Sequence, residues 1–206
     1  MKLYLKNHAE RYPVEQLQLQ LFAQEPSEFC TEPFTGDGTV SSLSRGKRYL
    51  TATAKVTYQG KTGFAVNRVL LDRADVRATR RILQRSYYLA ALQVLPAAPP
   101  WGALSGVRPT KLSTKCLMAG GSERDAERLL RQTYFVSPER ARLCVDASRH
   151  TVEAAKKLDA DDLSVYIGIP FCPTRCAYCS FVSQSIERFG EFLPAYLDAL
   201  LREIAH

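Results

Sequence analysis

The stretch YIGIPFCPTRCAYCSF, residues 166–181, is the most informative part of this sequence. It holds Cys172, Cys176 and Cys179 in the spacing C-x3-C-x2-C. Three thiolates on one short loop can hold an iron–sulfur cluster while leaving one iron without a protein ligand. An open metal position is where a substrate or cofactor can bind, as in catalytic zinc sites. The loop is therefore predicted to be a metal site that carries out chemistry.

The residues on either side predict the structure around this loop. An apolar, β-branched run over residues 165–169 predicts a strand before it. A helical apolar pattern over residues 187–204 predicts a helix after it. The loop is thus expected to connect a strand to a helix.

The three cysteines could also serve a zinc site, a redox pair or no chemistry at all. A structural zinc site needs four ligands, and no histidine of the chain stands at zinc-finger spacing. A redox pair of Cys176 and Cys179 matches C-x-x-C, but it leaves Cys172 without a role. If the three thiols were buried and had no function, these reactive residues would stand so close together in the sequence only by chance. The remaining cysteines are scattered and are expected to pack as small hydrophobic residues: Cys30, Cys116 and Cys144.

The composition favours a soluble protein with a packed core. Of the 206 residues, 46% are hydrophobic and 24% are charged, as in ordinary globular proteins. No uncharged apolar run approaches the roughly 18 residues of a membrane helix, and the N-terminus lacks the apolar segment of a signal peptide. We therefore expect a cytoplasmic protein without a membrane partner, in which the cysteines are reduced.

The net charge of +7 suggests an anionic partner. Part of the excess lies in arginines that recur at helical spacing: Arg73, Arg77, Arg80, Arg81 and Arg85. This stripe is either a solvated helix face or a surface for phosphates or an acidic substrate. Because no aromatic residues are interleaved with it, nucleic acid is not expected as a partner.

Residues 1–96 are predicted to form a small α+β domain. A short strand and a helix precede a loop over residues 26–37, and a β-hairpin and a long basic helix follow it. Pro96 ends the basic helix. The expected elements are a strand at 2–6, a helix at 13–23, hairpin strands at 49–58 and 62–71, and a helix at 73–95.

Residues 97–160 are predicted to form a linker and a helical subdomain, and residues 161–206 a third domain. The linker is expected to dock Trp101 onto the helices, or alternatively to present Arg108 and Lys111 to an anionic group. Helices are expected at 110–119, 122–134 and 137–158. Ser122 and Ser137 are predicted to be the N-cap residues of the second and third of these helices.

The cysteine spacing, with an aromatic residue just before the last cysteine, resembles that of the radical S-adenosylmethionine enzymes. The segment YIGIPFC at 166–172 resembles the entry to this loop in oxygen-independent coproporphyrinogen III oxidases, also called coproporphyrinogen dehydrogenases. Residues 101–111, which begin with WG and end with GVRPTK, resemble the branch labelled HemZ. That branch carries an N-terminal extension of about this size.

The resemblance implies a 4Fe–4S cluster on Cys172, Cys176 and Cys179, with S-adenosylmethionine on the fourth iron. Tyr166 would lie against the cofactor, and Tyr178 would support its adenine. The implied enzyme is an oxidoreductase of porphyrin and haem biosynthesis that generates a 5′-deoxyadenosyl radical. It would decarboxylate two propionates of coproporphyrinogen III oxidatively to vinyl groups. Its partners would be the porphyrinogen and an electron donor such as flavodoxin or ferredoxin.

Two departures from the better-known oxidases keep alternatives open. Gly168 stands where they have histidine, and Ser180 and Phe181 stand where they have glycine and a further cysteine. These residues are closer to the HemZ branch and partly to the haem chaperone branch HemW. A haem chaperone therefore remains an alternative. A radical enzyme that acts on RNA, bound by the N-terminal domain and its arginine stripe, is a further alternative.

The resemblance also sets an expectation for the end of the chain. Residues 161–206 would supply only the first βα unit of a partial TIM barrel, whereas a complete eight-fold barrel takes about 250 residues. We therefore expect this chain to be the N-terminal portion of a longer protein. Alone, it is expected not to turn over substrate.

Overall fold

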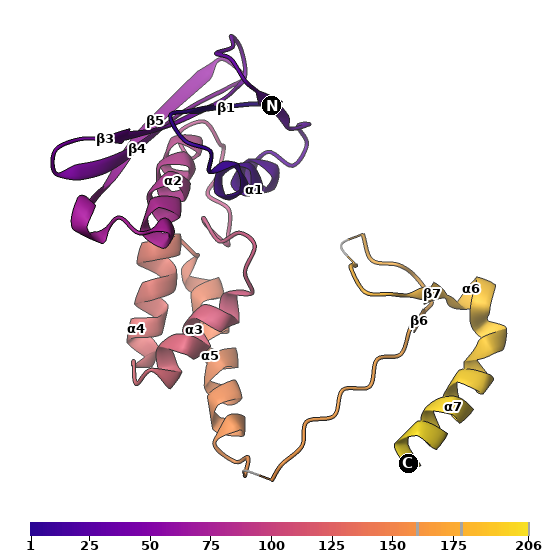
Figure 1. Cartoon of the computed structure of the whole chain (residues 1–206). Coiled ribbons are helices and arrows are strands. Elements are labelled where there is room, and N and C mark those ends of the chain that lie inside the picture. Colours follow the sequence, from indigo (N-terminus) through magenta and orange to yellow (C-terminus); the bar gives the residue numbers. More distant parts are fainter. Residues whose placement is uncertain (160, 178, 206) are drawn as a thin grey trace. The chain divides into compact units, whose positions relative to one another are not determined.

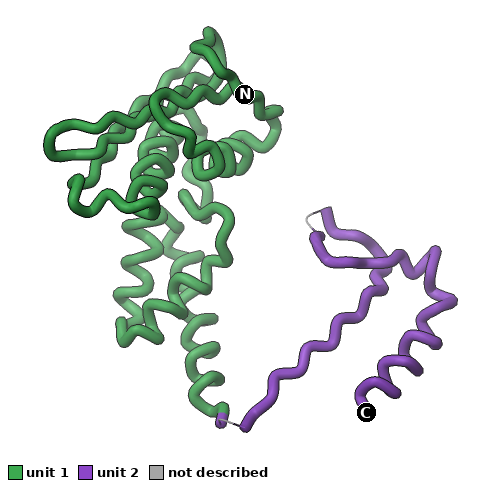
Figure 2. The backbone as a smooth tube through the Cα atoms, viewed as in Figure 1, with its two compact units in different colours: residues 1–158 green, residues 159–206 purple. Residues whose placement is uncertain are grey.

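The computed structural model describes residues 1–159, 161–177 and 179–205. They form two compact units, Met1–Leu158 and Asp159–His206 (Figure 2). Within the described residues, no helix combines the length and apolar character needed to cross a membrane.

The first unit is built on a five-stranded mixed sheet in the order β2-β1-β3-β4-β5. β1 (Lys2–Lys6) runs parallel to both β2 (Glu28–Cys30) and β3 (Gly38–Arg45). β4 (Tyr49–Tyr58) is antiparallel to β3 and to β5 (Lys61–Leu70). The expected strand at 2–6 and the hairpin are therefore confirmed.

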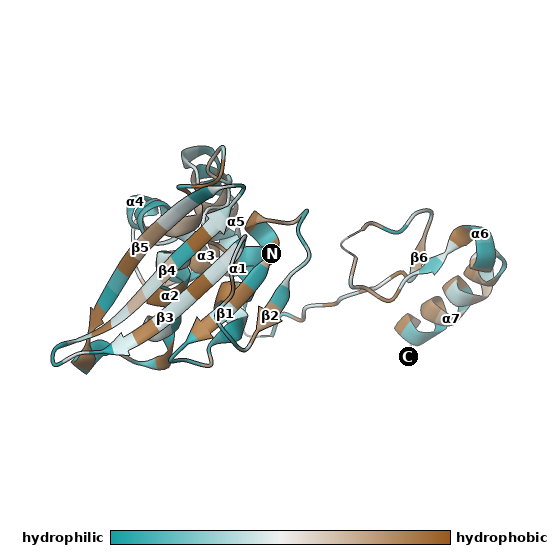
Figure 3. Ribbon diagram, turned by 90° about the horizontal axis from the view of Figure 1, so that it is seen from above, coloured by the Kyte–Doolittle hydropathy of each residue, from teal (hydrophilic) through white to brown (hydrophobic). Residues whose placement is uncertain are grey.

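Helices α1 (Arg11–Leu21) and α2 (Val76–Ala91) cover one face of this sheet (Figure 1). Apolar and polar residues alternate along β4, which places Ala52, Ala54 and Val56 in the core (Figure 3). α2 adds Leu83 and Tyr87 to the same core. The other face of the sheet has no helix packed on it among the described residues.

The sequence analysis missed two strands of this sheet. β2 lies inside the segment predicted to be a loop, and β3 was not predicted. β3 reads GTVSSLSR, so it is rich in serine and poor in the β-branched residues that favour strands. It is a strand because β1 and β4 pair with both of its edges, and Thr39 and Ser41 are buried as a result.

The basic helix is shorter than predicted, because a side-chain cap fixes its start. The carboxylate of Asp75 accepts a hydrogen bond from the Ala78 amide at 2.6 Å, which satisfies a free donor of the first turn. The preceding residues, Leu71–Arg73, form a 3-10 turn instead. The helix ends at Ala91, four residues earlier than predicted.

The rest of the first unit is helical and has a second core. It consists of α3 (Pro109–Met118), α4 (Glu123–Arg128), a π-helical turn (Leu129–Thr133) and α5 (Pro138–Ala155). Ser122 and Ser137 cap α4 and α5 as predicted. Trp101 packs against the core of these helices, which includes Leu130 and Cys144, as the sequence also predicted.

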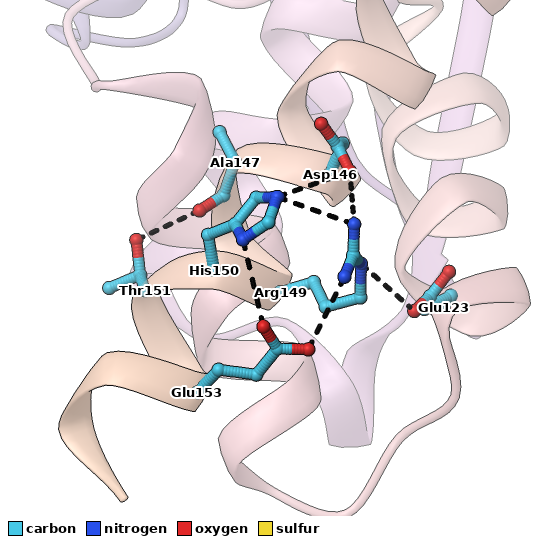
Figure 4. A network of polar contacts seen from close by, with 7 residues as sticks. All are labelled: Glu123, Asp146, Ala147, Arg149, His150, Thr151 and Glu153. Atoms are coloured by element: carbon cyan, nitrogen blue, oxygen red, sulfur yellow. Dashed lines mark hydrogen bonds and ion pairs between the residues drawn. The ribbon is translucent and has the colours of Figure 1, made fainter. Parts of the chain in front are cut away.

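A polar network joins α4 to α5 (Figure 4). The guanidinium of Arg149 lies 2.6 Å from a carboxylate oxygen of Asp146 and 3.3 Å from one of Glu153, both on α5. It also lies 3.8 Å from Glu123 on α4, while His150 lies between Asp146 and Glu153. Arg149 is half-buried and its partners are exposed, so the network adds little to stability.

The second unit contains β6 (Phe171–Cys172), β7 (Gln184–Ser185), α6 (Ile186–Phe189), a 3-10 turn (Gly190–Phe192) and α7 (Leu193–Ala205). The predicted strand over residues 165–169 is wrong. These residues have no strand partner among the described residues, and a strand exists only where its backbone groups pair. The described residues accordingly do not show the expected βα unit of a barrel.

Candidate functional site

The three-cysteine loop begins at a short parallel strand pair. Cys172 is the last residue of β6 and stands opposite Ser185 of β7. The amide of Gln184 donates a hydrogen bond to the carbonyl of Pro170 at 2.6 Å. The loop is thus closed at its base, which holds both ends of the cysteine segment close together.

Within the loop, a backbone turn joins the other two cysteines. The amide of Cys179 donates to the carbonyl of Cys176 at 3.0 Å. Cys172 and Cys179 are half-buried and Cys176 is exposed, and all three are free thiols. The residues between β6 and β7 therefore present thiols without a disulfide.

A cavity of about 310 Å³ opens beside this loop. Cys172, Cys179 and Tyr166 line it, so two predicted ligands and one predicted cofactor contact face the same space. Tyr166 is 85% exposed. Cys176 does not line this cavity, and Tyr178 lies outside the described residues.

Other residues shape the cavity, and the motif did not predict their roles. Phe181, Val182 and Ser183 form part of its wall. At Gly168, a Cβ atom would lie 3.3 Å from the ring of Tyr166, so glycine leaves room for that ring. In the sequence, Gly168 within the YIGIPFC segment was the feature from which this contact could have been predicted.

α7 holds the segment that leads into the loop. The hydroxyl of Tyr196 donates a hydrogen bond to the carbonyl of Gly168 at 2.8 Å. Its ring meets that of Phe171 edge-on, with centroids 5.5 Å apart. The helix therefore fixes the backbone on the N-terminal side of Cys172.

The donors match a cluster in chemistry but are not assembled as one. Three thiols from one loop are the ligands that iron–sulfur clusters take. Across the described ranges, however, no three His, Cys, Asp or Glu side chains are arranged to hold a metal ion. The structure brings two of the thiols to one cavity, and the complete ligand set stays a prediction.

Residues elsewhere that the sequence analysis considered have simpler roles. Cys144 is buried in the second core, and burial raises the pKa of its thiol. Cys116 packs against the same core. Arg108 and Lys111 are exposed at the start of α3, and no ion pair is recorded for either within the described parts of the chain.

The fold and the loop together define a mixed α/β protein with three free thiols on one loop, two of which line a small cavity. The chain is similar to a curated protein of Bacillus subtilis (strain 168) described as "Oxygen-independent coproporphyrinogen-III oxidase-like protein HemZ". The two are 31% identical over 188 residues, which is 87% of this chain and 36% of that relative. The predicted resemblance is thereby confirmed, and the chain spans about a third of the relative's length. No family model and no solved structure matches the chain.

Proposed function

We propose that this chain is part of a radical S-adenosylmethionine oxidoreductase of the oxygen-independent coproporphyrinogen oxidase type. The observation that carries the proposal is the cysteine loop: two of its thiols and Tyr166 line one cavity. The similarity to a coproporphyrinogen-III oxidase-like protein supports it further. A cofactor-binding loop of this kind would work only with the rest of a longer protein.

Cys172, Cys176 and Cys179 would hold a 4Fe–4S cluster. When bound, this group supplies the electron that turns S-adenosylmethionine into a source of a hydrogen-abstracting radical. The exposure of Cys176 and the turn that joins it to Cys179 allow the loop to close around a metal without disturbing a core. Tyr166 would pack against the cofactor from the cavity wall.

The proposed reaction is oxidative decarboxylation of propionate side chains to vinyl groups on coproporphyrinogen III. The substrate is proposed from the printed name of the relative and from the resemblance of the loop and of residues 101–111. A flavodoxin or ferredoxin would be the electron donor. Cytoplasmic location belongs to the same proposal, because the cluster and free thiols need a reducing compartment.

The first test addresses the cluster in this chain. After anaerobic reconstitution with iron and sulfide, we expect about four irons and four sulfides per chain. Cys172→Ser, Cys176→Ser and Cys179→Ser should each lose most of the bound iron, whereas the control Cys30→Ser should keep it. Iron retained in all three loop variants, or zinc bound in preference to iron, would contradict the assignment.

The second test addresses the reaction and uses the complete protein. Reconstituted protein should release 5′-deoxyadenosine, methionine and carbon dioxide when S-adenosylmethionine, coproporphyrinogen III and a reductant are present. Haem binding without that release would favour a haem chaperone instead. RNA binding by the 206-residue chain with a steep salt dependence would favour the RNA enzyme.

A further inference from the structure

A second and larger cavity lies in the first unit, apart from the cysteine loop in sequence. Its volume is about 750 Å³, within the range of small-molecule sites. The C-terminal end of α2, the proline segment at 98–99, α4 and the π-helical turn supply its walls. We refer to it below as the arginine cleft.

Three arginines from one helical face line this cleft: Arg124, Arg128 and Arg131. Arg124 and Arg128 lie about one turn apart on α4, and Arg131 follows in the π-helical turn, so the three succeed one another over roughly 10 Å of helix. Glu127 is the acidic residue among the lining side chains, so the lining carries a net positive charge of two. Arginines spaced along a row can each bind a different anionic group, so the row suits a ligand with several separated anionic groups better than one compact anion.

The arginines are available to a ligand. Arg128 pairs with Asp125 at 3.1 Å and Arg131 with Glu127 at 3.1 Å, but these pairs are exposed and therefore weak. Arg124 forms no ion pair among the described residues. A carboxylate that accepts two parallel hydrogen bonds from a guanidinium would compete well with such contacts.

The cleft also has an apolar lining. Phe135, Leu92 and Pro99 are half-buried and line this part of the cleft, and the buried ring of Tyr88 stacks behind Phe135 at 5.0 Å with an interplanar angle of 25°. The guanidinium of Arg85 lies 4.7 Å from the Phe135 ring centroid and donates to the carbonyl of Gln132 at 3.2 Å. The aromatic wall is therefore fixed before any ligand binds.

The backbone of this wall is unusual. Leu129–Thr133 form a π-helical turn, a rare element that is frequent at functional sites. Phe135 has φ 59, a left-handed conformation that is strained for a bulky residue. Gly102 also has positive φ, and a Cβ there would clash with the carbonyls of Tyr134 and Phe135. The surrounding chain thus holds Phe135 in a costly position on the cleft wall.

We infer that the arginine cleft binds a flat, largely apolar molecule that carries two or more separated carboxylates. The apolar wall selects the body of the ligand, and the arginine row selects its charges. Propionate-bearing porphyrins, which are planar tetrapyrroles, have this chemistry. The cleft itself does not depend on the proposed function, and only the choice of a tetrapyrrole as probe rests on it.

The test is a titration of the 206-residue chain, without cluster reconstitution, with coproporphyrin III, the oxygen-stable relative of the porphyrinogen. Arg124→Gln should weaken binding about tenfold, the effect of losing one charge-assisted hydrogen-bonding partner. Arg77→Gln, an exposed helical arginine outside the cleft, should leave affinity unchanged. Circular dichroism and the melting temperature of each variant show whether it is folded.

Two further ligands sharpen the test. The uncharged tetramethyl ester of coproporphyrin should bind at least tenfold more weakly than the acid, and ATP should not compete. The inference would be overturned if coproporphyrin III did not bind, or if its ester bound as tightly as the acid. It would also be overturned if ATP bound more tightly than coproporphyrin III, or if Arg124→Gln left the affinity unchanged. Since no cluster or turnover is involved, this failure is distinguishable from failure of the proposed reaction.

Discussion

At the residue scale, Gly63 marks the place where β5 and α2 meet without room for a side chain. A Cβ atom there would clash with the carbonyl oxygen of Ala90 and lie 2.9 Å from Cβ of Gln93. The side-chain amide of Gln93 also bonds the backbone of Phe64, donating to its carbonyl at 2.9 Å. These contacts hold an edge strand to the helix.

We predict that Gly63→Ala lowers the free energy of unfolding by about 1–3 kcal/mol, because the helix must move away from the strand. Urea unfolding followed by circular dichroism measures the change. Gly46→Ala is the matched control, since the nearest atom to its Cβ, the Tyr49 carbonyl oxygen, lies 3.6 Å away. Equal stability of the two variants would contradict the close approach.

His8 makes stability depend on pH. Its Nε2 lies 3.2 Å from the Ser41 carbonyl, and its buried Nδ1 has no hydrogen-bond partner among the described residues. Burial lowers the pKa of His8, outweighing Ser41 and Glu10, which raise it. The unfolded chain therefore binds the proton at a higher pH than the folded chain does.

The free energy of unfolding should consequently fall as the pH drops through about 6.5, and it should level off below the folded pKa. Urea unfolding at a series of pH values from about 8 to about 5 measures this slope. His8→Gln should flatten it. An unchanged slope in the variant would show that other groups cause the pH dependence.

At the element scale, the two serine-capped helix starts were predicted well, whereas the start of α2 at the Asp75 cap was missed. Ser137 caps α5: its hydroxyl accepts a hydrogen bond from the Arg140 amide at 3.3 Å, and Pro138 occupies the first helical position. Serine followed by proline is a local signal, because the cap and the first turn are neighbours in sequence.

Ser137→Ala should lower the free energy of unfolding of the first unit by about 1 kcal/mol, through loss of this cap. Ser137→Gly should cost only a few tenths of a kcal/mol, since glycine is tolerated at the cap. Thermal and urea unfolding measure both. If glycine is as destabilising as alanine, the hydroxyl has a role beyond capping.

Strands were less predictable than helices. The alternation along β4 identified it, whereas β3 has few strand-forming residues and was missed. At 165–169 a strand was predicted that does not form, since this β-branched run has no strand partner among the described residues. Both errors have one cause, because a strand depends on distant partners that a local pattern does not reveal.

At the scale of the whole molecule, the two units differ in how much they bury. The first has two hydrophobic cores, one under the sheet and one among α3 to α5. In the second, no described residue is buried, and Leu201 and Ile204 of α7 are exposed. Since burial of apolar surface drives folding, stability should reside in the first unit.

A fragment of residues 1–158 should therefore melt within about 2 °C of the 206-residue chain, because the change in unfolding free energy is expected to stay below about 1 kcal/mol. Differential scanning calorimetry of both proteins measures this. A fragment of residues 1–118 is the control and should be much less stable, since it lacks most of the second core. A large drop for 1–158 would show that the second unit stabilises the first.

The sequence by itself determined the cysteine motif, its family resemblance, the hairpin and the capped helices, because each depends on residues that are close in the chain. Only the tertiary structure decided which thiols share a cavity with Tyr166, that β3 is a strand, and that Arg124 and Phe135 line one cleft. Those features join residues distant in sequence, and their positions follow from packing and backbone pairing.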